Sequence, residues 1–473
     1  MHLAEERDFV FARKPLLGKL YAHYKDKYWP EYLVDMSQKL PGRVDPVLSS
    51  RFDELAQACQ KIATPLFGAQ LTQKIISTLK SRRFVNTSDH HGVLCHPFFL
   101  NFNLLRAIFS PDEPVISFTC GGTSFSNSSY PRGIFFHDAT LNKVQIPFVP
   151  WKYRQTSVYG HQPLENSDFQ KYKSRVPMLH IPKDQKDKLS LLYNIFQNDA
   201  RIQDSKSFSD QCSIMTYQSW NAAHMPGEMI YLECESIVRA LFLNTHLIND
   251  TLINKILFNQ SYRDAYLKYF EGITGAHFKT HGTQLFWYVD HKKMKKTALE
   301  VAMIENQYIL QSIDRTINIP LTPEEIRGHL QNHTLLPCLA LCYSMISFYY
   351  GITLGGGFSQ IQYLGDMKNA WNQILISVGD SDKSIATDIP TDIFTGDFVI
   401  AGICDSKRTV PATLLDIFLW GDTSTSQSLK KVFGRMTVGE CLDIMIPQLR
   451  HTLSPASGPM SNTQDFPASL YVK

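Results

Sequence analysis

Residues 83–97 read RFVNTSDHHGVLCHP, and this stretch decides how the rest of the chain is interpreted. Residues 83–85 are a short β-prone run, and Pro97 suits the first position of a helix that carries apolar residues through Ile108. The residues between them are therefore expected to form a strand-to-helix turn. That turn holds three histidines, a carboxylate and a thiol, so chemistry is expected there.

A second β-prone run, PVISFT at residues 114–119, follows the predicted helix and ends in CGGTS at residues 120–124. Together the three segments predict a β-α-β unit. Both loops then lie at the carboxyl ends of their strands, where open α/β sheets usually bind ligands. The sequence therefore predicts an α/β protein with a Rossmann-like core sheet.

Composition limits the classes of partner. The 473 residues are 44% hydrophobic and 12% aromatic, enough for two or three packed domains. Lys and Arg total 47 against 44 Asp and Glu, so the net charge of +3 gives no reason to expect nucleic acid or an acidic membrane. The nine cysteines include no CxxC pair, and the N-terminal MHLAEERDFVF lacks the apolar core of a signal peptide. We therefore expect a cytoplasmic protein.

Residues 334–364 carry no charge, and residues 335–354 are long enough to cross a bilayer. However, Pro337, Ser344 and Ser347 interrupt the run, a Gly-Gly-Gly sequence follows at 355–357, and no basic flank is present. The segment is interpreted as a buried helix that leads into a glycine-rich loop, and no membrane partner is expected.

Three regions are predicted along the chain. Residues 1–80 form a helical N-terminal cap, residues 81–370 the Rossmann-like core with helical insertions, and residues 371–473 a smaller mixed C-terminal region. Within the core, the apolar spacing of residues 228–270 predicts helices, and residues 283–289 read as a buried strand.

The turn residues Asp89, His90, His91 and His96 are the candidate catalytic groups. Histidine titrates near neutral pH, and a carboxylate can fix its tautomer, so proton transfer is the favoured role. Zinc binding is less favoured, because adjacent histidines seldom point at one ion, and no metal site is assigned. A structural role in the loop or at the helix start stays open. Cys95 as a nucleophile is a minor alternative.

Two polar loops and one helical residue are the candidate substrate-binding elements. The loop at residues 121–133 is rich in hydroxyls and carries one arginine, which suits phosphate or carboxylate, although it lacks a standard nucleotide-loop pattern. The glycines at 355–357 allow close backbone approach to a ligand, but an ordinary turn explains them equally well. The predicted binding residues are Asn101, Thr123, Ser124, Asn127, Arg132, Gly356, Gly357, Ser359, Gln360 and Tyr363.

Four short motifs carry a resemblance to a known family. Residues 89–97 resemble a Gln-Gln-Pro-Gly-Leu-x-x-Gly-Pro turn, with Gly92 and Pro97 at its first Gly and its Pro. QLFW at 284–287 resembles an Asn-Leu-Phe-Tyr strand, LLP at 335–337 a Leu-Leu-Pro, and GGFSQIQY at 356–363 a Gly-Gly-Pro-Ala-Glu-Ile-Ala-Tyr. Over residues 80–370 the chain thus resembles the bacillithiol-synthesis cysteine-adding enzymes, which join cysteine to an amino sugar conjugate in bacteria.

The chain departs from that family where the family carries charge. Asp89-His90 replaces its Gln-Gln pair, Asn103 its helix lysine, residues 121–124 its acidic turn, and Gln360 its loop glutamate. No heptad pattern after Met367 matches the family's coiled coil. The resemblance therefore implies a shared fold and a different substrate.

The preferred function is a bacterial, cytoplasmic biosynthetic enzyme, a ligase or transferase, that condenses or transfers a small amino-acid-like group onto a small-molecule acceptor. The expected partner is a small molecule of the nucleotide or amino-acid type. Two alternatives stay open: a non-catalytic small-molecule-binding or scaffold protein on the same fold, and a metal-assisted hydrolase. No cofactor and no oligomeric state follow from these residues.

Overall fold

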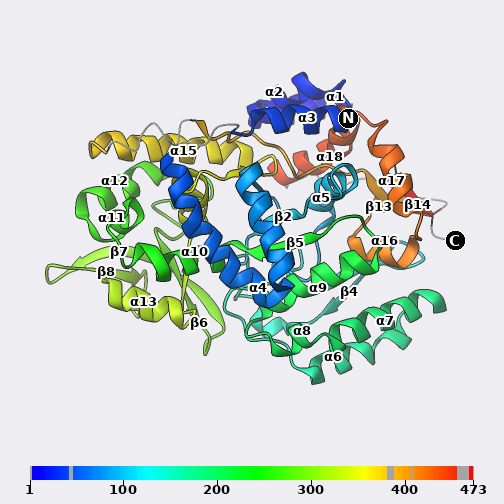
Figure 1. Cartoon of the computed structure of the whole chain (residues 1–473), viewed down its shortest axis with the longest axis horizontal. Helices are drawn as coiled ribbons and strands as arrows, with labels where there is room; N and C mark the ends of the chain where they lie inside the picture. The colour runs from blue at the N-terminus through cyan, green and yellow to red at the C-terminus, as the bar shows by residue number, and fades with distance from the viewer. Residues whose placement is uncertain (1–2, 42–45, 381–387, 406–407, 455–467, 472–473) are drawn as a thin grey trace.

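The computed structural model describes residues 3–41, 46–380, 388–405, 408–454 and 468–471. It is a mixed α/β protein that contains a parallel sheet (Figure 1). The helices are α1 Leu3–Arg13, α2 Pro15–Tyr24, α3 Trp29–Lys39, α4 Pro46–Arg82, α5 Pro97–Phe109, α6 Asn166–Lys173, α7 Lys183–Asn198, α8 Ala200–Asp204, α9 Phe208–Ala222, α10 Cys234–Leu241, α11 Leu252–Phe258, α12 Gln260–Phe270, α13 Pro323–Gln331, α14 Leu339–Tyr343, α15 Gln360–Ser377, α16 Leu414–Trp420, α17 Thr425–Phe433 and α18 Val438–Leu453.

The strands are β1 Phe84–Asn86, β2 Val115–Thr119, β3 Gly133–His137, β4 Lys143–Pro147, β5 Met229–Glu233, β6 Phe286–Asp290, β7 Lys295–Ile304, β8 Gln307–Ser312, β9 Asn318–Pro320, β10 Leu335–Pro337, β11 Thr353–Gly355, β12 Ala401–Cys404, β13 Thr409–Pro411 and β14 Ala468–Tyr471. Beside the parallel sheet, the described residues form an antiparallel sheet of order β10-β6-β7-β8-β9, a small sheet of order β13-β12-β14, and the β3-β4 hairpin.

The parallel sheet has the order β11-β1-β2-β5 in the described part of the chain. Val85 pairs with Leu354, Asn86 with Ser117, and Ser117 with Tyr231. All residues of these strands are buried, as expected for a sheet that is covered on both faces. Because the strands are parallel, the segments that follow them meet at one edge of the sheet.

Strand order places a switch point between β1 and β11. The chain moves from β1 to β2 and on to β5 in one direction, and then returns to the opposite side of β1 to form β11. The connections that leave β1 and β11 both start at the carboxyl edge of the sheet, and a crevice is expected outside the carboxyl ends of these two strands. The predicted turn at residues 87–97 and the glycine-rich loop border this crevice.

Helices cover the sheet and tie the two ends of the chain together. Helix α5 packs on β2, α9 packs on β5, and α4 packs on α9 and α10. The N-terminal helices α1 and α2 pack on the C-terminal helix α18, at the top of Figure 1. Trp29 of α3 stacks on Phe398 at a centroid distance of 4.0 Å and donates a hydrogen bond to Cys441 Sγ of α18. The N-terminal helices and the C-terminal helix α18 thus pack together as one layer.

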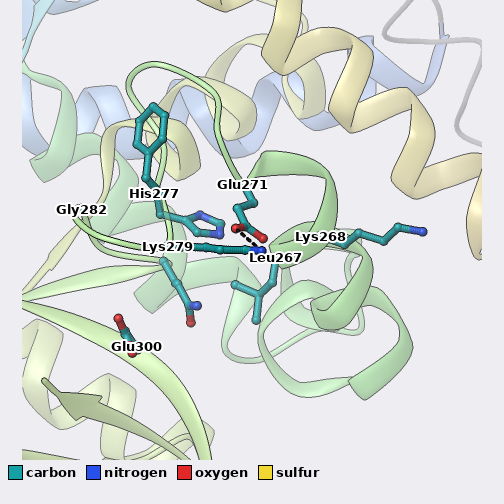
Figure 2. A pocket seen from close by; sticks show the side chains of 9 residues that line it. Leu267, Lys268, Glu271, His277, Lys279, Gly282 and Glu300 are labelled. Atoms are coloured by element: carbon teal, nitrogen blue, oxygen red, sulfur yellow. Dashed lines mark ion pairs between the residues drawn. The ribbon is translucent and has the colours of Figure 1, made fainter.

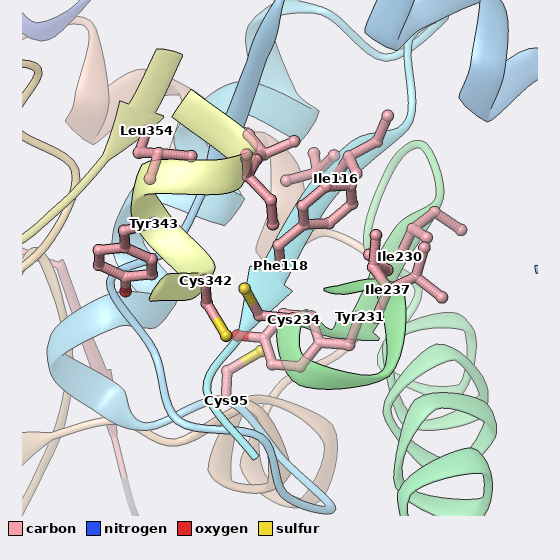
Figure 3. Packing of buried hydrophobic residues seen from close by; sticks show 14 of the residues in the cluster. Cys95, Ile116, Phe118, Ile230, Tyr231, Cys234, Ile237, Cys342, Tyr343 and Leu354 are labelled. Atoms are coloured by element: carbon pink, nitrogen blue, oxygen red, sulfur yellow. The ribbon is translucent and has the colours of Figure 1, made fainter. Parts of the chain in front are cut away.

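The structure changes one prediction about secondary structure. Residues 228–270 were expected to be helical, but Met229–Glu233 forms β5, the strand at the end of the parallel sheet. A strand buried on both faces shows a continuous apolar run, which periodicity does not distinguish from a buried helix. Figure 3 shows Tyr231 of this strand packed beside Phe118 and Cys234 in the core.

The uncharged segment at residues 334–364 contains several elements instead of one helix. It forms β10, α14, the π-helix Ser344–Tyr349, β11 and the start of α15. Within the ranges that the structure describes, no helix combines the length and apolar character needed to cross a bilayer. The glycine-rich loop follows β11 and leads into α15, so a loop lies where it was predicted, but a strand precedes it in place of the predicted helix.

Asn101 fixes the position of the segment that precedes β12. Its Oδ1 accepts hydrogen bonds from the backbone N–H of Ile400 at 3.0 Å and of Ala401 at 2.9 Å, and its Nδ2 donates to the carbonyls of Pro97 and Phe398. The side chain is fully buried. Three of its four hydrogen bonds therefore hold α5 against residues 398–401, and the fourth lies within α5.

We predict that Asn101→Ala lowers the free energy of unfolding by about 2–4 kcal/mol, because two buried N–H groups lose their acceptor. Urea unfolding measures this change. Asn166→Ala, at an exposed position at the start of α6, is the matched control and should stay within about 0.5 kcal/mol of wild type. An Asn101→Ala variant as stable as this control would contradict the proposed anchoring role.

Candidate functional site at the carboxyl edge of the sheet

A cavity of about 270 Å³ lies at the carboxyl edge of the parallel sheet, and we call it the sheet-edge cavity. Segments that follow β1, β2 and β11 contribute to it, together with α14 and the loop before β12. Its lining residues are Thr87, Ser88, Asp89, His90, Phe99, Cys120, Thr123, Leu339, Tyr343, Gly357, Phe358, Ser359, Gln360, Tyr363 and Asp397. The fold thus brings both predicted loops to the wall of one cavity.

Asp89 is a buried carboxyl group in the wall of this cavity, with an exposed fraction of 2%. Its Oδ2 accepts hydrogen bonds from the Tyr231 hydroxyl at 2.7 Å and from the His96 N–H at 3.0 Å, and its Oδ1 accepts from the His90 N–H at 2.8 Å. Burial raises the pKa of Asp89 from 3.8 to about 7, although these donors oppose the shift. Asp89 can therefore exchange a proton near neutral pH.

Asp397 is a second buried carboxyl group in the cavity wall, and no sequence pattern had marked it as a site residue. It adopts a positive φ of 58°, a conformation that costs energy for a residue other than glycine. Its Oδ2 accepts a hydrogen bond from the Phe358 N–H at 2.9 Å. Burial raises its pKa from 3.8 to about 6, while the positive charge of Lys14 acts in the opposite direction.

The glycine-rich loop holds Asp397 close to its own backbone. A Cβ atom at Gly357 would lie 2.1 Å from Asp397 Oδ2, so any larger residue at this position would displace the Asp397 carboxyl group. Gln360 is buried and donates a hydrogen bond from Nε2 to Thr87 Oγ1, which joins the loop to the end of β1. Ser359 accepts a hydrogen bond from Lys14 Nζ at 3.4 Å. A residue from the N-terminal helices thus reaches this loop.

The other predicted residues of this loop lie close to the cavity. Tyr363 lines it, and its ring lies near that of Tyr343 at a centroid distance of 6.4 Å. Gly356 precedes the lining residue Gly357, and its backbone forms a β-bridge with Phe394. The predicted Gly356 therefore does not line the cavity itself, and its backbone pairing ties the loop to the segment around Phe394.

Of the three predicted histidines, only His90 lines the sheet-edge cavity. Its Nδ1 lies 3.0 Å from Ser129 Oγ, and its backbone forms a β-bridge with Cys120. Burial lowers the pKa of His90 to about 4, so the imidazole is neutral at physiological pH. It can act as a hydrogen-bond partner of a ligand.

His91 and His96 have structural partners in the fold. His91 is fully buried, with Nδ1 2.6 Å from Thr119 Oγ1 and Nε2 3.0 Å from the Ser209 carbonyl oxygen. His96 is the N-cap of α5, where its Nδ1 accepts a hydrogen bond from the Phe98 N–H. Neither residue lines the cavity, and their contacts favour the structural role that the sequence had left open.

In the loop after β2, Thr123 alone of the predicted binding residues lines the cavity. Ser124 pairs with Ser157 in a β-bridge, and Asn127 Oδ1 accepts from the Ser129 N–H. Arg132 donates to the Val149 carbonyl and stacks over Trp151 at 5.0 Å. The backbone of Ser124 and the side chains of Asn127, Arg132 and Asn101 thus have partners within the protein, and none of these residues lines the cavity.

Cys120 and Glu235 form a further pair that sequence reasoning missed. Glu235 is buried behind the loop after β2 and accepts hydrogen bonds from the N–H groups of Gly121 and Gly122, each at 2.8 Å. Cys120 Sγ donates to Glu235 Oε1 at 3.2 Å. Burial raises the pKa of Glu235. Only the fold brings these residues together, because 115 positions separate them.

Cys95, the minor candidate for a nucleophile, does not line the sheet-edge cavity. It is 1% exposed and packs in the core shown in Figure 3. Burial raises the pKa of its thiol well above the ordinary value, which keeps it protonated. Among the described residues, no three His, Cys, Asp or Glu side chains converge in a way that could hold a metal ion.

A second cavity of about 300 Å³ is lined by the end of α12, the segment that follows it and Glu300 of β7, and Figure 2 shows its side chains. Glu271 and Lys279 form an ion pair of 3.9 Å there, with 85% of the Lys279 side chain exposed. Such an exposed pair is weak, and no predicted site residue lines this cavity. We therefore place the candidate site at the sheet edge.

Comparison of the chain with protein-family models, with curated proteins and with solved structures finds no match. The functional argument therefore depends on the geometry of the sheet-edge cavity alone.

The raised pKa of Asp397 predicts a pH dependence of stability. The unfolded chain releases this proton near pH 3.8 and the folded protein near pH 6, so between these values the folded state binds more protons. The contribution of Asp397 to stability therefore falls by about 3 kcal/mol as the pH rises through this window. Relative to wild type, Asp397→Asn should gain that amount between about pH 4 and about pH 7 in urea unfolding. A pH-independent difference would contradict the shift.

Proposed function

We propose that the protein is a cytoplasmic biosynthetic enzyme that condenses or transfers a small amino-acid-like group onto a small-molecule acceptor. The observation that carries the proposal is the presence of two buried carboxyl groups, Asp89 and Asp397, in the wall of one cavity. Their pKa values of about 7 and about 6 suit groups that accept and return protons at neutral pH.

The lining of the cavity supports an amine-bearing substrate. A volume of about 270 Å³ is at the small end for ligand pockets, which favours a metabolite the size of an amino acid. An ammonium group would be attracted by a carboxylate of Asp397 or Asp89, and the same carboxylate can take the proton that the amine must lose before it attacks an acyl group. The neutral His90 and the hydroxyl of Ser359 can orient the polar groups of the substrate.

The strand order supports a Rossmann-like core, and the state of the cysteines supports a cytoplasmic location. The order β11-β1-β2-β5 corresponds to the fourth, first, second and third strands of the chain's parallel sheet, the arrangement of the first four strands in doubly wound, Rossmann-like sheets. We therefore propose a Rossmann-like core and a distant relation to the bacillithiol-synthesis cysteine-adding enzymes. The structure describes all nine cysteines and places none of them in a disulfide, which fits a reducing compartment such as the cytoplasm.

One observation favours a second candidate, a non-catalytic small-molecule-binding protein. Both oxygens of Asp89 already accept hydrogen bonds from within the protein, three in total. A carboxylate held in this way can serve to shape the loop without exchanging a proton. In that case Asp397 would bind the ligand and no product would form.

Native mass spectrometry of the full chain with pooled amino acids, nucleoside triphosphates and sugar acceptors tests the proposal. We expect a complex with an amino-acid-like compound and the mass of a condensed product. Asp397→Asn should weaken binding about tenfold or more because a charged contact is lost, whereas Asp264→Asn, on the exposed face of α12, should not. Binding without product would support the second candidate, and a chain that binds nothing would overturn both.

A further inference from the structure

Cys120 is the single partly exposed cysteine of this protein; the structure describes all nine, and the other eight are buried. It follows β2 directly and lines the sheet-edge cavity. A small molecule in the cavity would therefore meet this thiol, whereas the thiols of the core stay out of reach. The same cavity holds Asp89 and Asp397, so the thiol faces the space in which proton transfer is proposed.

Glu235 lies in the position of a base for this thiol. Its Oε1 is 3.2 Å from Cys120 Sγ, within the reach of a sulfur hydrogen bond. Burial, and next the negative charge of Glu235, raise the pKa of the Cys120 thiol well above its ordinary value, so the resting sulfur is protonated. The sulfur consequently needs a base to become nucleophilic, and the carboxylate beside it can take the proton.

Two further groups would stabilise the negative charge that Cys120 carries once its proton has moved to Glu235. The Thr123 hydroxyl donates a hydrogen bond to Cys120 Sγ at 3.7 Å. Lys296 of β7 donates to the Gly122 carbonyl at 2.6 Å, and its positive charge interacts with both Cys120 and Glu235. The ammonium thus stays close to the pair whether the negative charge is on the carboxylate or on the sulfur.

We propose that Cys120 is a covalent nucleophile that carries the transferred acyl group as a thioester, with Glu235 as its base. This inference depends on the proposed function. The acyl donor belongs to the class of activated esters or acyl phosphates. The Cys120 S–H proton moves to Glu235, the sulfur attacks the acyl carbon, the bond from that carbon to the leaving oxygen breaks, and the leaving group takes the electron pair and is protonated by Glu235.

A second step returns the enzyme to its starting state. The amine of the acceptor attacks the thioester carbon and forms a C–N bond, while the C–S bond breaks and the electron pair returns to the sulfur. Asp397 or Asp89 takes the proton that the amine loses, and this proton then passes to the sulfur, so the carboxylate and the thiol both return to their starting states. The overall exchange is acyl transfer from oxygen to nitrogen, and no oxidant or reductant is required.

Acylation of the full chain with p-nitrophenyl acetate tests the inference. We expect one equivalent of p-nitrophenolate to be released rapidly, an increase of one acetyl group in the intact mass, and a peptide map that places this group on Cys120. Cys120→Ala should lose the adduct. Glu235→Gln should slow acetylation about a hundredfold because the base is lost, whereas Glu300→Gln, at an exposed site on β7, should not.

The peptide map of the wild-type chain decides the question even if Glu235→Gln fails to fold. An unmodified chain, or acetyl groups spread over surface lysines, would overturn the covalent role of Cys120, as would a folded Glu235→Gln variant that reacts at the wild-type rate. Amino-acid binding by Cys120→Ala distinguishes failure of the thioester proposal from failure of the proposed function. If this variant binds its ligand and the wild-type chain is not acetylated at Cys120, the proposed function stands and the thioester is excluded.

Discussion

The burial of four short parallel strands on both faces is the constraint on which the remaining structure depends. Strands of three to five residues offer few backbone hydrogen bonds, so their stability requires helices on each side. Because the strands are parallel, the polar segments that follow them meet at one edge of the sheet. The sheet-edge cavity, with Asp89, Cys120 and Gly357 from three different strand ends, is a direct result of this arrangement.

Charge at this edge is controlled by burial more than by ion pairs. Asp89 and Asp397 have raised pKa values because water is largely excluded from them, and Glu235 shares this property. Lys14 and Lys296 come from a distant helix junction and from the antiparallel sheet, and each acts on one of these carboxyl groups. The N-terminal helices and the antiparallel sheet therefore tune the site without lining most of it.

Local signals in the sequence were sufficient for part of the fold. Pro97 begins α5, and residues 84–86 and 115–119 form strands as predicted. Strand β5 was taken for a helix because its apolar run is continuous on both faces. Of the predicted site residues, Asp89, His90 and the loop residues from Gly357 to Tyr363 border the cavity together with Thr123, whereas Arg132 and Asn101 have structural partners elsewhere.

The sequence by itself determined the β-α-β unit around residues 83–119 and the position of the candidate site, because β propensity, helix capping and turn chemistry are local properties. Only the tertiary structure decided which side chains share the cavity. Asp397 and the Cys120–Glu235 pair come from segments far apart in the chain, and no local pattern marks them. Their proximity and their pKa values arise from strand order and burial, which exist only once the sheet has formed.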